Sequence, residues 1–143
     1  MKWFATCLFL LSSCIALAQK DSVAIAQLII KDYTTMQNWD LPQHLNNCTH
    51  NYILIEKGVI QNMAQESEYY KKNVHRQIKR TDSFNFKNIR VYNNMGYAVY
   101  TLQSQVIENG ITKNYHWSES VVCRRIKNQW KIELIHSTAL PEN

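Results

Sequence analysis

The sequence predicts an α+β domain in which a curved antiparallel sheet packs on about three N-terminal helices. Two observations carry this prediction. Apolar residues recur at helical spacing in the first half of the chain, whereas the second half alternates apolar and polar residues in long runs. Helices gathered on one face of such a sheet form a two-layer α+β architecture.

Residues 1–18 have the pattern of a secretory signal peptide. Lys2 gives a positive start, residues 3–11 are almost wholly apolar, and Ala16-Leu17-Ala18 supplies a small-x-small cleavage site. The apolar run is shorter than the roughly 20 residues that span a bilayer. We therefore expect an exported protein, periplasmic or secreted, without a transmembrane span in its mature form.

Two alternatives to this cleavage remain open. Leu11-Ser12-Ser13-Cys14 resembles a bacterial lipobox, in which Cys14 would carry a lipid and anchor the protein to a membrane. A buried first helix is the other alternative, although Gln19, Lys20 and Asp21 interrupt the apolar run directly after the cleavage site.

Residues 19–143 have the size of one domain, with no internal repeat or linker. The whole chain has a formal net charge of +5, and its basic residues are dispersed. The densest basic run, residues 71–80, falls on a predicted helix, so we interpret it as a solvated helix face. We expect no nucleic-acid partner.

The first half is predicted to hold three helices and one short strand. Asp21 or Ser22 can cap a first helix that ends near residue 38. Pro42 suits the first turn of a short helix that continues to residue 46. A strand over residues 52–56 and a helix over residues 62–79 follow.

The second half is predicted to be an antiparallel meander of four strands. Asn109-Gly110 between two alternating runs is the strongest of its turn signals. Turns are also predicted at residues 93–96 and 127–129. The strands are expected over residues 84–91, 97–108, 111–126 and 130–138.

The hairpin turns predict which side chains share a face of the sheet. If Asn109-Gly110 is a two-residue turn, Tyr100 lies opposite Glu119 and Leu102 lies opposite Trp117. Because side chains alternate along a strand, these four residues lie on one mainly apolar face, which we expect to meet the helices.

The next turn determines the partner of the buried acid. If Asn128-Gln129 is the turn, Glu119 lies opposite Thr138, and His136 is its diagonal neighbour on the same face. Glu119 and His136 could exchange a proton with a ligand, or simply form a hydrogen bond between two strands. A one-residue slip in either turn would reverse the assignment.

The opposite face of the predicted sheet is semi-polar. In this register Arg124 lies opposite Glu133, which predicts an exposed ion pair. Such a face suits a homodimer interface, and otherwise it is solvated. Cys48 and Cys123 both sit beside apolar residues, so we favour two buried thiols over a disulfide.

Three segments resemble the nuclear transport factor 2-like superfamily, and more closely its SnoaL-like and uncharacterised bacterial exported branches. They are Ile25–Tyr33 with Trp39-Asp40, Gly96–Tyr100, and Trp130–Ser137. The resemblance implies a cone-shaped sheet with an internal pocket, and it implies frequent homodimers. Members include isomerases, dehydratases, cyclases and many binding or inactive domains.

These observations favour a domain that binds an unknown small molecule in a partly apolar pocket. An isomerase or dehydratase using Glu119 with His136, and a non-catalytic dimerisation module, are the alternatives. No residue spacing indicates a metal or a cofactor, so we expect neither. The predicted pocket residues are Trp39, Tyr52, Glu56, Tyr100, Trp117 and Thr138.

Overall fold

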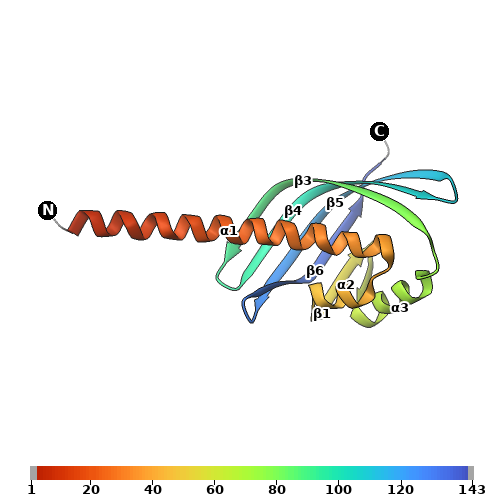
Figure 1. The fold of residues 1–143 in the computed structure, drawn as a ribbon, viewed down its shortest axis with the longest axis horizontal. Helices are drawn as coiled ribbons and strands as arrows, with labels where there is room; N and C mark the ends of the chain where they lie inside the picture. Colours follow the sequence, from red (N-terminus) through yellow and green to blue (C-terminus); the bar gives the residue numbers. More distant parts are fainter. Residues whose placement is uncertain (1–2, 142–143) are drawn as a thin grey trace.

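The computed structural model describes the backbone of residues 3–141 and the side chains of residues 19–141. Three helices pack on one face of a six-stranded sheet that curves without closing (Figure 1). This confirms the α+β prediction. The sheet is mixed rather than purely antiparallel, because one pair of neighbouring strands is parallel.

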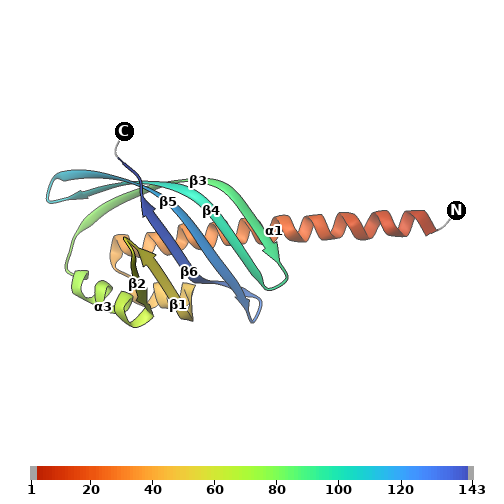
Figure 2. The same cartoon turned by 180° about the vertical axis from the view of Figure 1, so that it is seen from behind.

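Helix α1, Trp3–Asn38, crosses the concave face of the sheet and buries Ile25, Ile29 and Tyr33. Its first part, residues 3–18, projects beyond the edge of the sheet (Figures 1 and 2). The predicted signal peptide and Cys14 lie outside the residues with described side chains. Within the described part of the chain, no helix is long and apolar enough to cross a membrane.

Local signals begin and end the two short helices. Helix α2, Leu41–Asn47, follows Asp40, whose side chain accepts a hydrogen bond from the Gln43 amide at 3.0 Å. Helix α3, Met63–Asn73, begins with a capping box formed by Asn62 and Gln65.

The predicted third helix is too long at its C-terminal end. The structure ends α3 at Asn73, and strand β3 already begins at Ile78. The basic run of residues 71–80 is therefore divided between a helix and a strand, and the interpretation of one solvated helix face is wrong.

Strands β1, Cys48–Glu56, and β2, Val59–Asn62, form a hairpin at one edge of the sheet. Lys57 and Gly58 make its turn with φ values of 52° and 76°. The sequence did not predict β2. Strand β1 also pairs in parallel with β6 in the centre of the sheet, a contact between segments far apart in the chain.

The remaining strands form the predicted meander, and the sheet order is β2-β1-β6-β5-β4-β3. Their observed bounds are β3 Ile78–Tyr92, β4 Met95–Glu108, β5 Ile111–Ile126 and β6 Gln129–Ala139.

The predicted register of β4 against β5 is confirmed. Asn109 and Gly110 form the turn with φ values of 51° and 77°, which is the backbone shape of a tight hairpin. Tyr100 pairs with Glu119 and Leu102 pairs with Trp117, as the turn predicts.

The predicted register of β5 against β6 is wrong. The turn is formed by Lys127 and Asn128, and a bulge at Glu133 then shifts the pairing, so that Glu119 lies opposite Ser137. Because an extra residue reverses the alternation of faces, Ile135 and Ser137 point inward beyond the bulge. His136 and Thr138 point outward and are exposed.

The outer face of the sheet carries the predicted ion pair. Nη2 of Arg124 lies 2.7 Å from Oε1 of Glu133. The three helices leave this face uncovered (Figure 2).

Candidate functional site

A cavity of about 410 Å³ lies between the concave face of the sheet and the helices. Residues from all three helices and from every strand line it. Its walls combine apolar side chains with two groups of buried charged residues. A concave, partly apolar pocket with a few polar groups is the usual form of a small-molecule site.

The structure brings most of the predicted site residues together. Five of them line the cavity: Trp39, Tyr52, Glu56, Trp117 and Glu119.

Three predicted residues lie elsewhere. Tyr100 is fully buried in the core beneath Glu119, its neighbour on the adjacent strand, and does not line the cavity. His136 and Thr138 lie on the outer face, because the register of β6 differs from the predicted one. A contact between Glu119 and His136 is thereby ruled out in this structure.

Glu119 is 4% exposed, and both of its carboxylate oxygens accept hydrogen bonds. The Tyr33 hydroxyl donates to Oε2 at 2.5 Å, and the Ser137 hydroxyl donates to Oε1 at 2.7 Å. Burial, with the nearby Tyr100 and Glu119, raises the pKa of Tyr33 well above its ordinary value. The Tyr33 hydroxyl therefore stays protonated and acts as the donor in this pair.

Arg80 places a positive charge beside this group. Its Nε lies 2.9 Å from Asp82, its Nη2 donates to the Ser104 hydroxyl at 3.0 Å, and its guanidinium lies over the rings of Tyr33 and Trp117. The sequence did not predict this arrangement, because the basic run that ends at Arg80 was interpreted as a solvated face. In strand β3 its side chain points into the cavity.

Aromatic and charged residues form another part of the cavity wall. Arg76 pairs with Glu108 at 2.7 Å and lies over the Trp39 ring at 5.4 Å. The Trp39 indole donates a hydrogen bond to the Arg76 carbonyl at 3.1 Å, and the ring of Tyr69 packs edge-on against Trp39. Trp39 is thus fixed in position by contacts on several sides.

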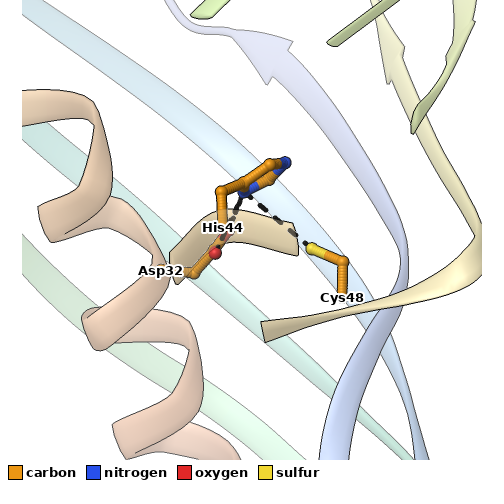
Figure 3. A group of neighbouring side chains, drawn as sticks. All are labelled: Asp32, His44 and Cys48. Atoms are coloured by element: carbon orange, nitrogen blue, oxygen red, sulfur yellow. Dashed lines mark hydrogen bonds and ion pairs between the residues drawn. The ribbon is translucent and has the colours of Figure 1, made fainter. Parts of the chain in front are cut away.

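A second buried polar group, which the sequence did not predict, lies between α1 and α2. Nδ1 of His44 is 3.0 Å from one oxygen of Asp32 and 3.2 Å from the other (Figure 3). The Asn47 amide also donates to Asp32 at 3.0 Å. His44 is 1% exposed and stacks on the ring of Tyr70, so its orientation is fixed.

Asp32 controls the charge state of His44. Burial acts to lower the pKa of the imidazole, but the hydrogen bond to Asp32 and the charges of Asp32 and Glu66 outweigh it, so the pKa of His44 is raised. With Nδ1 directed at Asp32, the other ring nitrogen, Nε2, is buried without a hydrogen-bond partner among the described residues.

Three described side chains have donor atoms that could hold a metal ion. They are Asp32, His44 and Cys48, and one donor atom from each lies within 4.8 Å of the others. Asp32 and the Cys48 thiol both face Nδ1 of His44, the thiol at 3.9 Å (Figure 3). The hydrogen bond between His44 and Asp32 accounts for this arrangement. Burial raises the pKa of the Cys48 thiol, which disfavours the deprotonated thiolate that binds a metal.

Glu66 lies in the same part of the cavity as His44. It is 3% exposed and has no hydrogen-bond partner among the residues with described side chains. Burial raises the pKa of its carboxyl, partly countered by the charge of His44. This acid therefore borders the cavity without the donors that satisfy Glu119.

One sequence signal could have indicated these residues. Asp32 falls on the stripe of α1 that buries Ile25 and Ile29, and Glu66 precedes the buried Tyr70 by one helical turn. A carboxylate on the buried stripe of a helix needs a partner or a function. The partner His44 could not have been inferred from spacing, because it lies on a different helix.

The two cysteines are free and buried. Both Cys48 on β1 and Cys123 on β5 lie beside Ile132 of the intervening strand β6. Strands are spaced about 4.8 Å apart, so two spacings exceed the roughly 7 Å limit for a disulfide. The expectation of two thiols is confirmed.

Comparison with solved structures identifies the class of fold. A nuclear transport factor 2-like superfamily protein from Salmonella enterica matches with a TM-score of 0.74 at 18% identity, over 87% of this chain and 94% of that one. A ketosteroid isomerase-like protein from Erwinia carotovora atroseptica matches with a TM-score of 0.69 at 12% identity, over 85% and 98% of the two chains.

The association domain of the Caenorhabditis elegans kinase CaMKII matches with a TM-score of 0.70 at 15% identity, over 85% and 97% of the two chains. No family model and no curated protein matches the sequence. The chain therefore has the nuclear transport factor 2-like fold, as its sequence predicted. Its similarity to these structures establishes the fold alone.

Proposed function

We propose that this protein binds a small, partly apolar organic molecule in the cavity. The observation that carries the proposal is a cavity of about 410 Å³ with apolar walls and two buried polar groups. Ligand pockets of roughly 300–1,000 Å³ with few, fixed polar groups are typical of small-molecule sites. Leu54, Leu102 and Val106 supply apolar wall, and Glu66 and Glu119 supply hydrogen-bonding groups.

We also propose that binding takes place outside the cytoplasm. The signal pattern of residues 1–18 supports export to the periplasm or the medium. Lipidation at Cys14 would instead leave the domain tethered to a membrane. Mass spectrometry of the protein from an exporting cell separates the two forms, since cleavage leaves Gln19 as the first residue and lipidation leaves a modified Cys14.

A ligand that copurifies with the protein provides the direct test. Native mass spectrometry is expected to show added mass that leaves on denaturation. Val106→Trp would fill the cavity and abolish the added mass. The matched control is Ile107→Trp, because the neighbouring residue points to the other face of the same strand. Added mass that survives in Val106→Trp would contradict the proposal, as would the absence of any bound or added small molecule.

Self-association through the outer face of the sheet is a second candidate function. The helices leave this face uncovered, and half-buried Val99, Val122 and Leu134 alternate there with polar residues. A fold neighbour that is a kinase association domain supports the idea. Light scattering is expected to give the mass of a dimer for the wild type and of a monomer for Val122→Glu. A monomeric wild type would overturn it.

A further inference from the structure

Two polar groups that line the cavity have no partner among the described residues. The carboxyl of Glu66 is on a residue that is only 3% exposed, and it accepts no hydrogen bond from them. Nε2 of His44, a residue that is 1% exposed, also lacks a hydrogen-bond partner. A buried polar group without a partner costs free energy, so such groups mark places where a ligand supplies the missing contact.

Both arginines that line the cavity are already engaged by acidic residues. Arg76 pairs with Glu108 at 2.7 Å, and Arg80 pairs with Asp82 at 2.9 Å. Lys57 also borders the cavity, but it is exposed in the turn between β1 and β2 and forms no ion pair with a described residue. An anionic ligand would therefore have to compete with an existing carboxylate at either arginine.

Two of the acidic side chains that line the cavity are not engaged in this way. Asp32 pairs with His44, and Glu119 accepts two hydrogen bonds. Glu66 and Glu56 remain, and neither forms an ion pair or a hydrogen bond with a described residue. Burial raises the pKa of the Glu66 carboxyl, and the charges of Asp32 and Glu56 raise it further against the opposing charge of His44. A positive charge on a ligand would relieve this repulsion.

We propose that the cavity binds an organic amine, with its primary ammonium group on the carboxylates of Glu66 and Glu56. An ammonium group carries a positive charge and three N–H donors, which are the two things that Glu66 lacks. Leu54 lies two residues before Glu56 on the same face of β1, so it offers an apolar surface to the body of the amine. The inference rests on the proposed binding function and gives it a ligand class.

Hydrogen bonding, rather than an aromatic surface, selects the ammonium group. A quaternary ammonium group has no N–H and is usually held over the faces of aromatic rings. The Trp39 ring already has the Arg76 guanidinium over it at 5.4 Å and packs edge-on with Tyr69. The Tyr52 ring is packed edge-on with His44. The carboxylates are left to recognise the ligand, so a primary amine is favoured over its trimethylated form.

A metal ion is the other cation that acidic side chains could take. The described side chains whose donor atoms come close enough together for a metal are Asp32, His44 and Cys48, and neither Glu56 nor Glu66 belongs to this group. A calcium ion takes about 6–8 oxygen ligands, more than two glutamates supply. The two carboxylates therefore suit an ammonium group better than a metal.

The test compares 2-phenylethylamine with 2-phenylethanol, which has the same carbon skeleton and a hydroxyl in place of the ammonium group. Calorimetric titration of the purified protein near neutral pH measures both affinities. We expect the amine to bind at least ~10-fold more tightly than the alcohol, because its hydrogen bonds to the carboxylates carry charge. The trimethylated amine should also bind more weakly than the primary amine.

Substitutions assign this preference to the two carboxylates. Glu66→Gln should lower the affinity for the amine by at least ~10-fold and leave the affinity for the alcohol unchanged. Glu56→Gln should act in the same direction with a smaller effect, since this residue is only half-buried. Glu68→Gln is the matched control, because Glu68 lies on the same helix as Glu66, is exposed and does not line the cavity. Circular dichroism checks folding, and Glu56→Gln keeps the test decisive if Glu66→Gln does not fold.

The outcomes separate this inference from the proposed binding function. Equal affinity for the amine and the alcohol would overturn the inference while the binding function stands. Amine binding that Glu66→Gln and Glu56→Gln both leave unchanged, or tighter binding of the trimethylated amine, would do the same. Displacement of the amine by calcium chloride, but not by sodium chloride of equal ionic strength, would assign the carboxylates to a metal. Binding of neither compound would overturn the inference, and the copurified ligand then decides the binding function independently.

Discussion

Two carboxylates at different places in one cavity show how equal burial produces unequal chemistry. Glu119 and Glu66 are 4% and 3% exposed. Glu119 accepts two hydrogen bonds from Tyr33 and Ser137, whereas Glu66 accepts none from the described side chains. Satisfied buried acids mainly hold structure together, and unsatisfied ones are available to a ligand.

The comparison also explains how the candidate site differs from the predicted one. Glu119 was expected to act with His136, but its observed partners are a tyrosine and a serine that belong to the protein interior. The histidine that borders the cavity is His44, which is hydrogen-bonded to Asp32, and Glu66 lines the same cavity. We therefore regard Glu119 as the structural end of the cavity and Glu66 as the end whose carboxylate is left open to a ligand.

The largest expected effect of a substitution follows from this assignment. Glu119→Ala would leave the hydroxyls of Tyr33 and Ser137 buried without an acceptor. It should lower the free energy of unfolding by on the order of 3 kcal/mol. Urea denaturation measures this change, and a loss below about 1 kcal/mol would contradict the structural role of Glu119.

A double-mutant cycle should give a smaller, more specific number. Tyr33→Phe removes the donor to Oε2 of Glu119 and is expected to cost about 1 kcal/mol of unfolding free energy. Combined with Glu119→Gln, it should be non-additive, because the two residues form one hydrogen bond. Ser137→Ala combined with Tyr33→Phe supplies the comparison within the same group. Full additivity of Tyr33→Phe with Glu119→Gln would show that the bond contributes nothing.

The pH dependence of stability should report on His44, which lines the same part of the cavity as Glu66. The pKa of His44 is raised in the folded protein, so its contribution is complete below about pH 6.5 and is lost as the pH rises through the folded pKa. His44→Gln should remove this decline in unfolding free energy. His136→Gln is the control, since this side chain is exposed on the outer face. An unchanged decline in His44→Gln would refute the linkage.

Glu66 should produce a second decline in the free energy of unfolding, which begins near the ordinary pKa of its carboxyl, 4.5. Its pKa is raised above 4.5 in the folded protein, so the folded state binds the proton more tightly and stability falls as the pH rises through the folded pKa. Denaturation of wild type and Glu66→Gln across this range measures the effect, which should be absent from the variant. A decline of equal size in both proteins would show that Glu66 does not cause it.

The smallest expected effect is the most useful for the comparison. Near neutral pH, Glu66→Gln should change the free energy of unfolding by no more than about 0.5 kcal/mol or increase it, because the carboxyl that it replaces accepts no hydrogen bond from the described residues. Glu68→Gln should leave it unchanged. A large loss in Glu66→Gln alone would mean that Glu66 is a structural residue like Glu119.

The sequence by itself determined the fold class, the end of the first helix, the second helix, the four-stranded meander and the register of β4 against β5. It did not determine the start of the first helix, because α1 begins at Trp3 and runs without a break through the predicted cap at Asp21 or Ser22. The features that it did determine depend on local signals: helical periodicity up to Asn38, the Asp40 cap, and the Asn109-Gly110 turn. Such signals act between residues near in the chain, so a single sequence contains them. The facing of Tyr100 and Glu119 followed directly from one well-specified turn.

Only the tertiary structure decided the partners of the polar residues. One bulge at Glu133 exchanged His136 for Ser137 on the concave face, and no local signal marks that bulge. The parallel pairing of β1 with β6, and the contact of Asp32 with His44, join elements whose relative positions depend on packing of the whole domain. Helix and strand patterns specify which face is buried, but the packing of those faces determines which buried carboxylate finds a donor and which is left to a ligand.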